Sequence, residues 1–263
     1  MDSWLSALDL PGHPLGYHQS LSATKLPRSL SVDVYEKMLR SYALGSEHDG
    51  PSREKTSEIG RQFDPVVASL LQGAFLCGNG SRGFKEESGR HAGIWFACES
   101  CAGIKRLVRA FLAMNRWDRK RAFVAAKVGG HRALEICIIG ALCEAHVVSI
   151  LLDVGLIVLE STVDEDVNLG IDAIALLPGA LDGNIVQVKG DRAAAGIEFL
   201  RVERDATSRE TWQKTENFNR AYSVSFSPVA ARVGTGKGGL FEYDSPENIE
   251  SAKNFFNRLR DPS

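Results

Sequence analysis

Apolar and polar positions in the second half of the chain follow a pattern that predicts helices and strands in turn. A long, mostly apolar run over residues 134–152 has the length of a helix, whereas the apolar runs after it are short and bounded by Gly, Pro and acidic residues. We expect strands over residues 156–162, 171–177, 184–190 and 196–203, and further helices over residues 211–222 and 246–259. Elements in this order predict an α/β fold in which helices pack on a central sheet.

The first 130 residues are patterned less regularly. Apolar clusters predict short helices over residues 34–44 and 64–75, and the glycine-rich segment 77–93 predicts a turn or hairpin. Apolar residues recur at helical spacing again between positions 104 and 112, which predicts an amphipathic helix. This part of the chain is therefore expected to be mainly helical.

Charge sharpens the division of the chain. The whole sequence of 263 residues has a formal net charge of -2, so affinity for nucleic acid would have to come from a local patch. Residues 101–132 form such a patch, because nine basic side chains stand there against one acid, Asp118, a local charge of +8. We divide the chain into a basic, mainly helical N-terminal region (residues 1–130) and an α/β domain (residues 131–263).

The basic segment has two open interpretations. It is either a solvated helix face or a contact surface for the phosphate backbone of DNA. The side chains that we expect to contact DNA are Lys105, Arg106, Arg109, Arg116, Arg119, Lys120 and Arg121.

Other features of the composition exclude some classes of protein. The most apolar stretch, residues 133–160, carries Glu135, Glu144 and Asp153, which argues against a membrane span. The first ten residues lack the pattern of a secretory signal. Five cysteines in a chain of this length do not indicate a disulfide framework, so we expect a cytoplasmic protein with reduced thiols and no membrane partner.

Candidate chemistry lies on the predicted strands of the α/β domain. Asp172 is the one acid within an otherwise apolar strand, and Gln187 and Lys189 lie two residues apart on the next strand. Side chains two residues apart in a strand point to the same face, so Gln187 and Lys189 can both face a metal ion held by Asp172. Phosphodiester hydrolysis needs a divalent cation, an activated water and positive charge near the developing phosphorane, and such a set would provide them.

These residues resemble those of a known family. A Glu within a helix, then a strand, then "GID" at the start of the next strand and "QVKG" on a third is similar to the PD-(D/E)XK, or restriction-endonuclease-like, superfamily. The likeness is greatest to the branch with Gln-x-Lys as its last motif, and it covers residues 133–203. It implies a mixed central sheet flanked by helices.

The resemblance also implies a role for each residue. Asp172 matches the central metal-binding Asp, and Lys189 matches the lysine that orients the water or stabilises charge. Gln187 stands at the position of the second acid, Glu144 at that of the helical Glu, and the carbonyl of Val188 would be a further metal ligand.

The expected function is a Mg2+-dependent (or Mn2+-dependent) endonuclease that hydrolyses DNA phosphodiester bonds, acting as a homodimer or within a larger nucleoprotein complex. The neutral Gln187 leaves a catalytically inactive DNA-binding or structural subunit of the same fold as an alternative. A second alternative is an α/β enzyme that acts on a small molecule. In that enzyme Asp172 and Lys189 would do other acid–base work. A further interpretation, without chemistry, makes Asp172 a cap or a satisfied core acid.

A second metal site is suggested by cysteine spacing. Cys98 and Cys101 have the spacing of a zinc knuckle, and Cys77 and His91 would complete a tetrahedral set that binds structural Zn2+. The alternative is a plain core segment.

Four smaller features complete the picture. We expect Cys143 to be a core thiol and His146 to be a packed helix residue. The acidic residues 164–166 are expected to form a solvated loop. The glycine-rich segment 233–239 lacks the Ser or Thr that a phosphate-binding loop carries after its lysine, and it predicts a flexible loop or hairpin.

Overall fold

The structure, a computed structural model, describes residues 15, 18, 20–21, 101–105, 107–115, 117–121, 132–178, 183–191, 194, 196–204, 208–235 and 246–260. The segments expected over residues 34–44, 64–75 and 77–93 lie outside these ranges. Two compact units make up the chain: unit 1 consists of Met1–Thr24 with His146–Ser263, and unit 2 consists of Lys25–Ala145. The boundary between the units therefore falls between Ala145 and His146, within the long helix Arg132–Asp153. The sequence predicted a division earlier, after residue 130.

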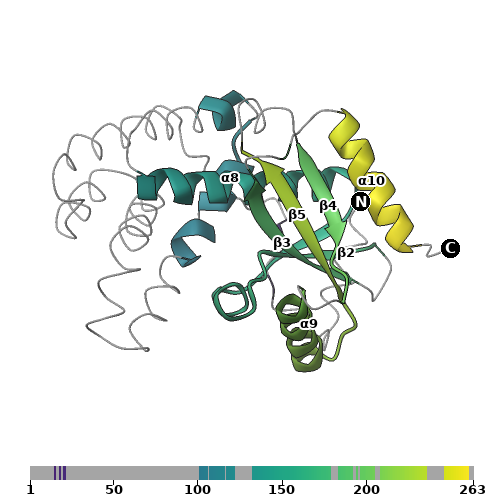
Figure 1. The fold of residues 1–263 in the computed structure, drawn as a ribbon. Helices are drawn as coiled ribbons and strands as arrows, with labels where there is room; N and C mark the ends of the chain where they lie inside the picture. Colours follow the sequence, from purple (N-terminus) through teal and green to yellow (C-terminus); the bar gives the residue numbers. More distant parts are fainter. Residues whose placement is uncertain are drawn as a thin grey trace, which may run out of the picture. The chain divides into compact units, whose positions relative to one another are not determined.

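Unit 1 is built on a five-stranded mixed sheet (Figure 1). The strands are β1 (Ile157–Glu160), β2 (Ala173–Leu176), β3 (Gly183–Asp191), β4 (Ile197–Arg201) and β5 (Ser227–Gly234). Their order across the sheet is β1-β2-β3-β5-β4. The strand β3 runs antiparallel to β2 and parallel to β5, and β4 closes the other side antiparallel to β5.

Helices flank this sheet. Those of unit 1 are the last part of α8 (Arg132–Asp153), which begins in unit 2, the short π-helix η1 (Glu165–Leu169), α9 (Arg209–Tyr222) and α10 (Pro246–Arg260). Helix α9 packs against β5 and η1, and α10 packs against β4. The α/β class with a mixed central sheet and flanking helices, as expected from the sequence, is thus confirmed.

The core beneath α9 determines which face of the sheet this helix covers. Phe218 of α9 is fully buried in a cluster with Ile174 of β2 and Ile185 of β3, which are paired across the two strands. Leu15 joins the same cluster, and the backbone of Leu21 bonds to β1. A short segment from the start of the chain therefore helps to close this side of the sheet.

Most of the expected elements are present, and the exceptions have physical reasons. Strand β5 was not predicted, because Pro228 and three small residues weaken the alternating apolar pattern of the sequence Ser227–Gly234. Val233 and Gly234 belong to this strand, which corrects the expected loop at that point. Among the described residues, no helix combines the length and apolar character needed to cross a bilayer.

Candidate functional site

The candidate site lies where β2 begins beside the middle of β3. Asp172 directly precedes β2, and its backbone N–H donates to the carbonyl of Val186 at 3.1 Å. Its side-chain oxygen Oδ2 accepts a hydrogen bond of 2.5 Å from the backbone N–H of Val188. The carboxylate is therefore held against the strand segment that carries Gln187 and Lys189.

The alternation of side chains along β3 places the other two predicted residues. Ile185 faces the core beneath α9, so Gln187 and Lys189 lie on that same face of the strand. Exposure rises along the strand: Ile185 is buried, Gln187 is half-buried and Lys189 is exposed. The structure therefore brings Asp172, Gln187 and Lys189 together where the core beneath α9 opens to solvent.

Helix α9 adds a second lysine to this place. Gly170, two residues before Asp172, has a φ of 63°. A Cβ atom built on it would lie 3.1 Å from Nε2 of Gln187 and 3.8 Å from Nζ of Lys214. Both side chains thus reach the turn that leads into Asp172.

An acid on α9 accompanies this lysine. Nζ of Lys214 forms an ion pair of 2.8 Å with Oε1 of Glu210, one helical turn earlier. The Lys214 ammonium lowers the pKa of the Glu210 carboxyl, and the charge of Lys189 lowers it further. Glu210 therefore lies within the field of both lysines, and these three charged side chains, with Asp172, form one polar group.

Lys214 and Glu210 were missed in the sequence. A Glu followed by a Lys four residues later is an ordinary stabilising pair on an exposed helix face, and nothing local distinguishes this one. Only the packing of α9 against η1 and β5 shows that the pair borders the site. No short-range signal in the sequence could have found it.

The segment before Asp172 is folded, which corrects the expected solvated loop. The N–H of Thr162 donates to Oε2 of Glu165 at 2.8 Å, and the N–H of Glu165 donates to Oγ1 of Thr162 at 3.2 Å. This is a capping box, and it starts the helical turn that continues into η1, whose C-cap is Gly170. Asp164 is exposed as expected, but Glu165 is only 2% exposed.

Glu165 also binds a residue from the start of the chain. Nε2 of His18 lies 3.0 Å from both carboxylate oxygens of Glu165. Burial alone would raise the pKa of Glu165, but hydrogen bonds from His18, Tyr222 and the Thr162 backbone outweigh it and lower the pKa to about 2. Glu165 is therefore a buried anion that holds η1 in place.

A further hydrogen bond fixes the backbone at Asp172. The hydroxyl of Ser161, at the end of β1, donates to the carbonyl of Ile171 at 2.5 Å and lies 3.0 Å from the carbonyl of Asp172. Ser161 is buried. The position of Asp172 is thus set from both neighbouring strands, β1 and β3.

The donor atoms at the site suit a hard divalent cation. They are the carboxylate of Asp172, the side-chain amide oxygen of Gln187 and the carbonyl of Val188, all oxygens, which Mg2+ and Mn2+ prefer. The N–H and C=O of one strand residue point to the same edge, so the Val188 carbonyl faces the side on which Asp172 lies. An ion held by this set, which contains one carboxylate, would be bound weakly. Among the described residues, no group of three or more His, Cys, Asp or Glu side chains forms an alternative metal site.

Glu144 and two neighbours lie on α8. Glu144 is half-buried and belongs to unit 2, whereas Asp172 belongs to unit 1, so its role as a metal ligand stays a prediction. His146 is buried, as expected for a packed helix residue. Burial raises the pKa of the Cys143 thiol to about 12, with a further contribution from the charge of Glu144, as expected for a core thiol.

The basic segment of unit 2 divides into buried and exposed side chains. Arg119 is buried, and its guanidinium donates to the carbonyls of Phe111 at 2.7 Å and of Leu112 and Met114 at 3.2 Å each. Lys105 is buried as well. The predicted contact with DNA is therefore wrong for Lys105 and Arg119, because a phosphate group cannot reach a buried cation unless the structure around it is displaced.

For the rest of the segment, contact with DNA stays a prediction. Lys120 and Arg121 are exposed, and Arg109 is half-buried. The side chains of Arg106 and Arg116 lie outside the described residues. So do Cys77, His91 and Cys98 of the predicted zinc site, whose fourth member, Cys101, is buried.

Comparisons with other proteins reveal no relative of this chain. The chain matches no protein-family model, and no curated protein or solved structure is significantly similar to it. Function is therefore inferred from the geometry of the site.

Proposed function

We propose that this protein is a metal-dependent nuclease of restriction-endonuclease-like fold that hydrolyses DNA phosphodiester bonds. The observation that carries the proposal is the hydrogen bond from the Val188 N–H to the Asp172 carboxylate. It joins an acid to the Gln187-x-Lys189 strand, as the resemblance to the PD-(D/E)XK superfamily requires. The order of α8, β1, β2 and β3 along the chain is also the order that the resemblance implies.

The roles follow from charge and donor type. Asp172, Gln187 and the Val188 carbonyl would hold Mg2+, with Glu144 expected to assist. A bound Mg2+ supplies Lewis acidity and lowers the pKa of a coordinated water. Lys189 is exposed on the strand beside Asp172, where its ammonium can stabilise the negative charge of the phosphorane or orient the attacking water.

Lys214 is proposed as a second positive group of the site. Its ammonium lies beside Gly170, as does the Gln187 amide, and it forms an ion pair with Glu210. Two ammonium groups from different elements, one strand and one helix, would then face the scissile phosphate. This lysine is not part of the resemblance and rests on the structure alone.

The alternative function is a DNA-binding subunit of the same fold without catalysis. One observation favours it: the donor set of Asp172, Gln187 and Val188 carries a single carboxylate. Such a subunit would bind DNA, with or without Mg2+, and would not cut it. The two functions differ in one measurable property, which is cleavage.

The test is cleavage of supercoiled plasmid and of linear and single-stranded DNA, with Mg2+, with Mn2+ and with EDTA. We expect metal-dependent cutting by the wild type and a loss of about 100- to 1000-fold in rate for Asp172→Ala and Lys189→Ala. Lys253→Ala, which removes an exposed lysine on α10, is the matched control and should cut as the wild type does. Wild-type protein that binds DNA but leaves every substrate intact would establish the binding subunit instead.

A further inference from the structure

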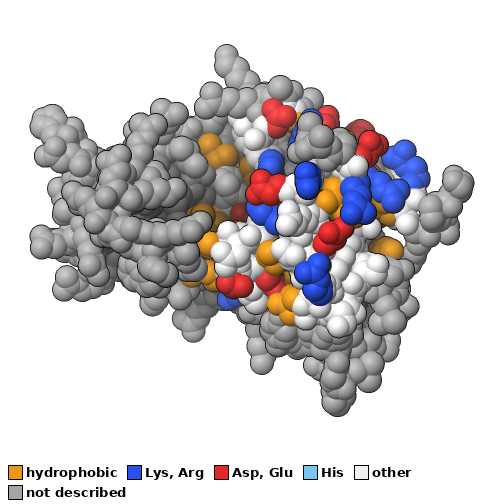
Figure 2. Space-filling view, turned by 60° about the horizontal axis from the view of Figure 1, so that its bottom comes forward, with side chains coloured by type: hydrophobic (Ala, Val, Ile, Leu, Met, Phe, Trp, Pro, Cys, Tyr) orange, Lys and Arg blue, Asp and Glu red, His pale blue; other side chains and the backbone are white. Residues whose placement is uncertain are grey.

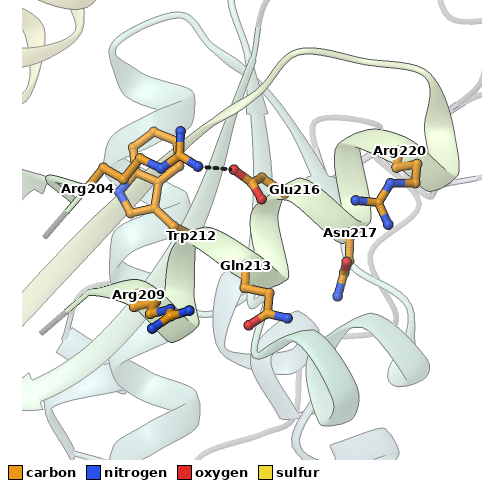
Figure 3. A pocket seen from close by; sticks show the side chains of 7 residues that line it. All are labelled: Arg204, Arg209, Trp212, Gln213, Glu216, Asn217 and Arg220. Atoms are coloured by element: carbon orange, nitrogen blue, oxygen red, sulfur yellow. Dashed lines mark ion pairs between the residues drawn. The ribbon is translucent and has the colours of Figure 1, made fainter. Parts of the chain in front are cut away.

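A basic pocket lies on α9, on side chains that the proposed active site does not use. It has a volume of about 560 Å³ and is lined by Arg204, Arg209, Trp212, Gln213, Glu216, Asn217 and Arg220. All but Arg204 come from α9, at positions that recur every three or four residues and so share one face of the helix. Figure 3 shows the α9 side chains projecting from successive turns of the helix, with Arg204 beside Trp212.

The pocket carries excess positive charge. Three arginines stand against one acid, Glu216, which pairs with Arg204 at 3.1 Å. Arg209 and Arg220 are exposed, and neither forms an ion pair with a residue that the structure describes. An anionic ligand would therefore meet two guanidinium groups that no described acid pairs with, and guanidinium groups bind phosphate in a bidentate manner.

An aromatic ring lies among these cations. The guanidinium of Arg204 is 5.9 Å from the centre of the Trp212 ring, and the Arg204–Glu216 pair that holds it there is exposed. Exposed ion pairs contribute little to stability, so Arg204 can turn towards a ligand at little cost. Basic side chains with an aromatic platform between them are the combination that binds single-stranded nucleic acid, whose bases are open to stacking.

The dimensions agree with a strand of nucleic acid. Arg209 and Arg220 are eleven positions apart on α9, which corresponds to about 16 Å along the helix axis. At about 3.4 Å per nucleotide this spans a few phosphates. Gln213 and Asn217 lie between the two arginines and offer amide groups to bases or sugars (Figure 3).

Figure 2 shows the side of the molecule on which α9 lies, and Lys and Arg side chains lie across its described part with Asp and Glu side chains between them.

We infer that this face of α9 binds a single strand of nucleic acid, with phosphates on Arg209 and Arg220 and a base stacked at Trp212. The opposite flank of the same helix carries Lys214 towards the candidate active site. The inference names the form of the substrate strand, and in that respect it rests on the proposed nuclease function. Binding itself does not depend on catalysis.

The experiment measures binding of a fluorescently labelled single-stranded oligonucleotide and of its duplex, in EDTA, over a series of salt concentrations. We expect the double variant Arg209→Ala with Arg220→Ala to bind the single strand at least tenfold more weakly. The slope of log affinity against log salt concentration (the salt slope) should also become less steep, by about 0.7 for each phosphate that the variant no longer neutralises. The matched control is Lys253→Ala with Arg258→Ala, which removes two exposed basic side chains from α10 and should bind as the wild type does.

Trp212 separates base stacking from simple charge attraction. Trp212→Leu should weaken single-strand binding by about tenfold and leave duplex binding unchanged, whereas Trp212→Phe, which keeps an aromatic ring, should retain most of the affinity. Wild-type affinity in the arginine double variant would overturn the inference, as would equal weakening of single-strand and duplex binding in Trp212→Leu. Because binding is measured without metal, a protein that binds in this way but cuts no DNA would refute the nuclease and not the strand-binding face.

Discussion

Gly170 occupies a position at the edge of the candidate site where a side chain would disturb both the backbone and the chemistry. Its φ of 63° lies in the left-handed region, which costs other residues about 1–2 kcal/mol. A Cβ atom there would also stand 3.1 Å from Nε2 of Gln187, closer than an ordinary contact. We expect Gly170→Ala to lower the free energy of unfolding by about 1–2 kcal/mol. By displacing Gln187, it should also slow cleavage by about 10- to 100-fold.

Gly155 provides a matched control for this prediction. Its φ of 86° carries a similar backbone cost, but nothing lies within 4 Å of a Cβ built on it. Gly155→Ala should therefore lose comparable stability in urea unfolding and keep wild-type cleavage under conditions in which both variants are folded. Equal activity in the two variants would show that Gln187 does not take part in the site.

At the residue scale, the sequence was enough to predict those site residues whose positions depend only on local geometry. Gln187 and Lys189 share a strand face because side chains alternate, and a single acid in an apolar strand marked Asp172. Lys214 could not be predicted as a site residue, because its position depends on how α9 packs against the rest of unit 1. Arg119 could not be recognised as a buried side chain, since its partners are backbone carbonyls five to eight residues earlier, and only the folded chain brings them within reach.

At the scale of elements, η1 depends on a buried charge. The pKa of Glu165 in the folded protein is about 2, against an ordinary value of 4.5. A lowered pKa means that the ionised carboxylate stabilises the fold fully above about pH 4.5, and that this contribution disappears as the pH falls towards 2. We expect Glu165→Gln to lower the free energy of unfolding at neutral pH by about 1–3 kcal/mol, because His18 loses its charged partner.

The measurement is urea unfolding of the wild type and of Glu165→Gln from neutral pH down to about pH 3. The stability gap between them should narrow as acid removes the charge that the variant already lacks. Glu216→Gln is the control, since it neutralises an exposed glutamate in an ion pair whose contribution is expected to be at most about 1 kcal/mol. A gap that stays constant with pH would show that Glu165 does not stabilise η1 through its charge.

Elements were predictable to the extent that their apolar pattern is strong. The helix α8 and the strands β1, β2, β3 and β4 lie within a few residues of their expected positions, because each is a bounded apolar run. Strand β5 lies inside the sheet, between β3 and β4, but it is rich in small residues, so its apolar pattern was too weak to predict it. The π-helix escaped notice because three consecutive acids look solvated, and the partner of the middle one, His18, is distant in sequence.

At the scale of the whole molecule, binding to nucleic acid would have to overcome a net charge of -2. Two local patches can do so: the exposed pair Lys120 and Arg121 in unit 2, and the α9 face with Arg209 and Arg220 in unit 1. If both patches bind the strand independently, the losses in binding free energy caused by their variants add up. If a patch does not contact the nucleic acid, its variant changes the affinity neither alone nor together with the other variant. The two patches can therefore be told apart by combining their variants.

We expect Lys120→Ala with Arg121→Ala to weaken binding of a long single-stranded oligonucleotide, and its decrease in log affinity should add to that of Arg209→Ala with Arg220→Ala. The salt slope should fall in the same additive way, by about 0.7 for each phosphate that is no longer neutralised. On an oligonucleotide of only about 5 nucleotides, the α9 variant alone should have an effect, since so short a strand covers one patch. If the four-residue variant binds the long oligonucleotide no more weakly than the α9 variant, the basic segment of unit 2 is a solvated helix face, and the charge that attracts nucleic acid resides in unit 1.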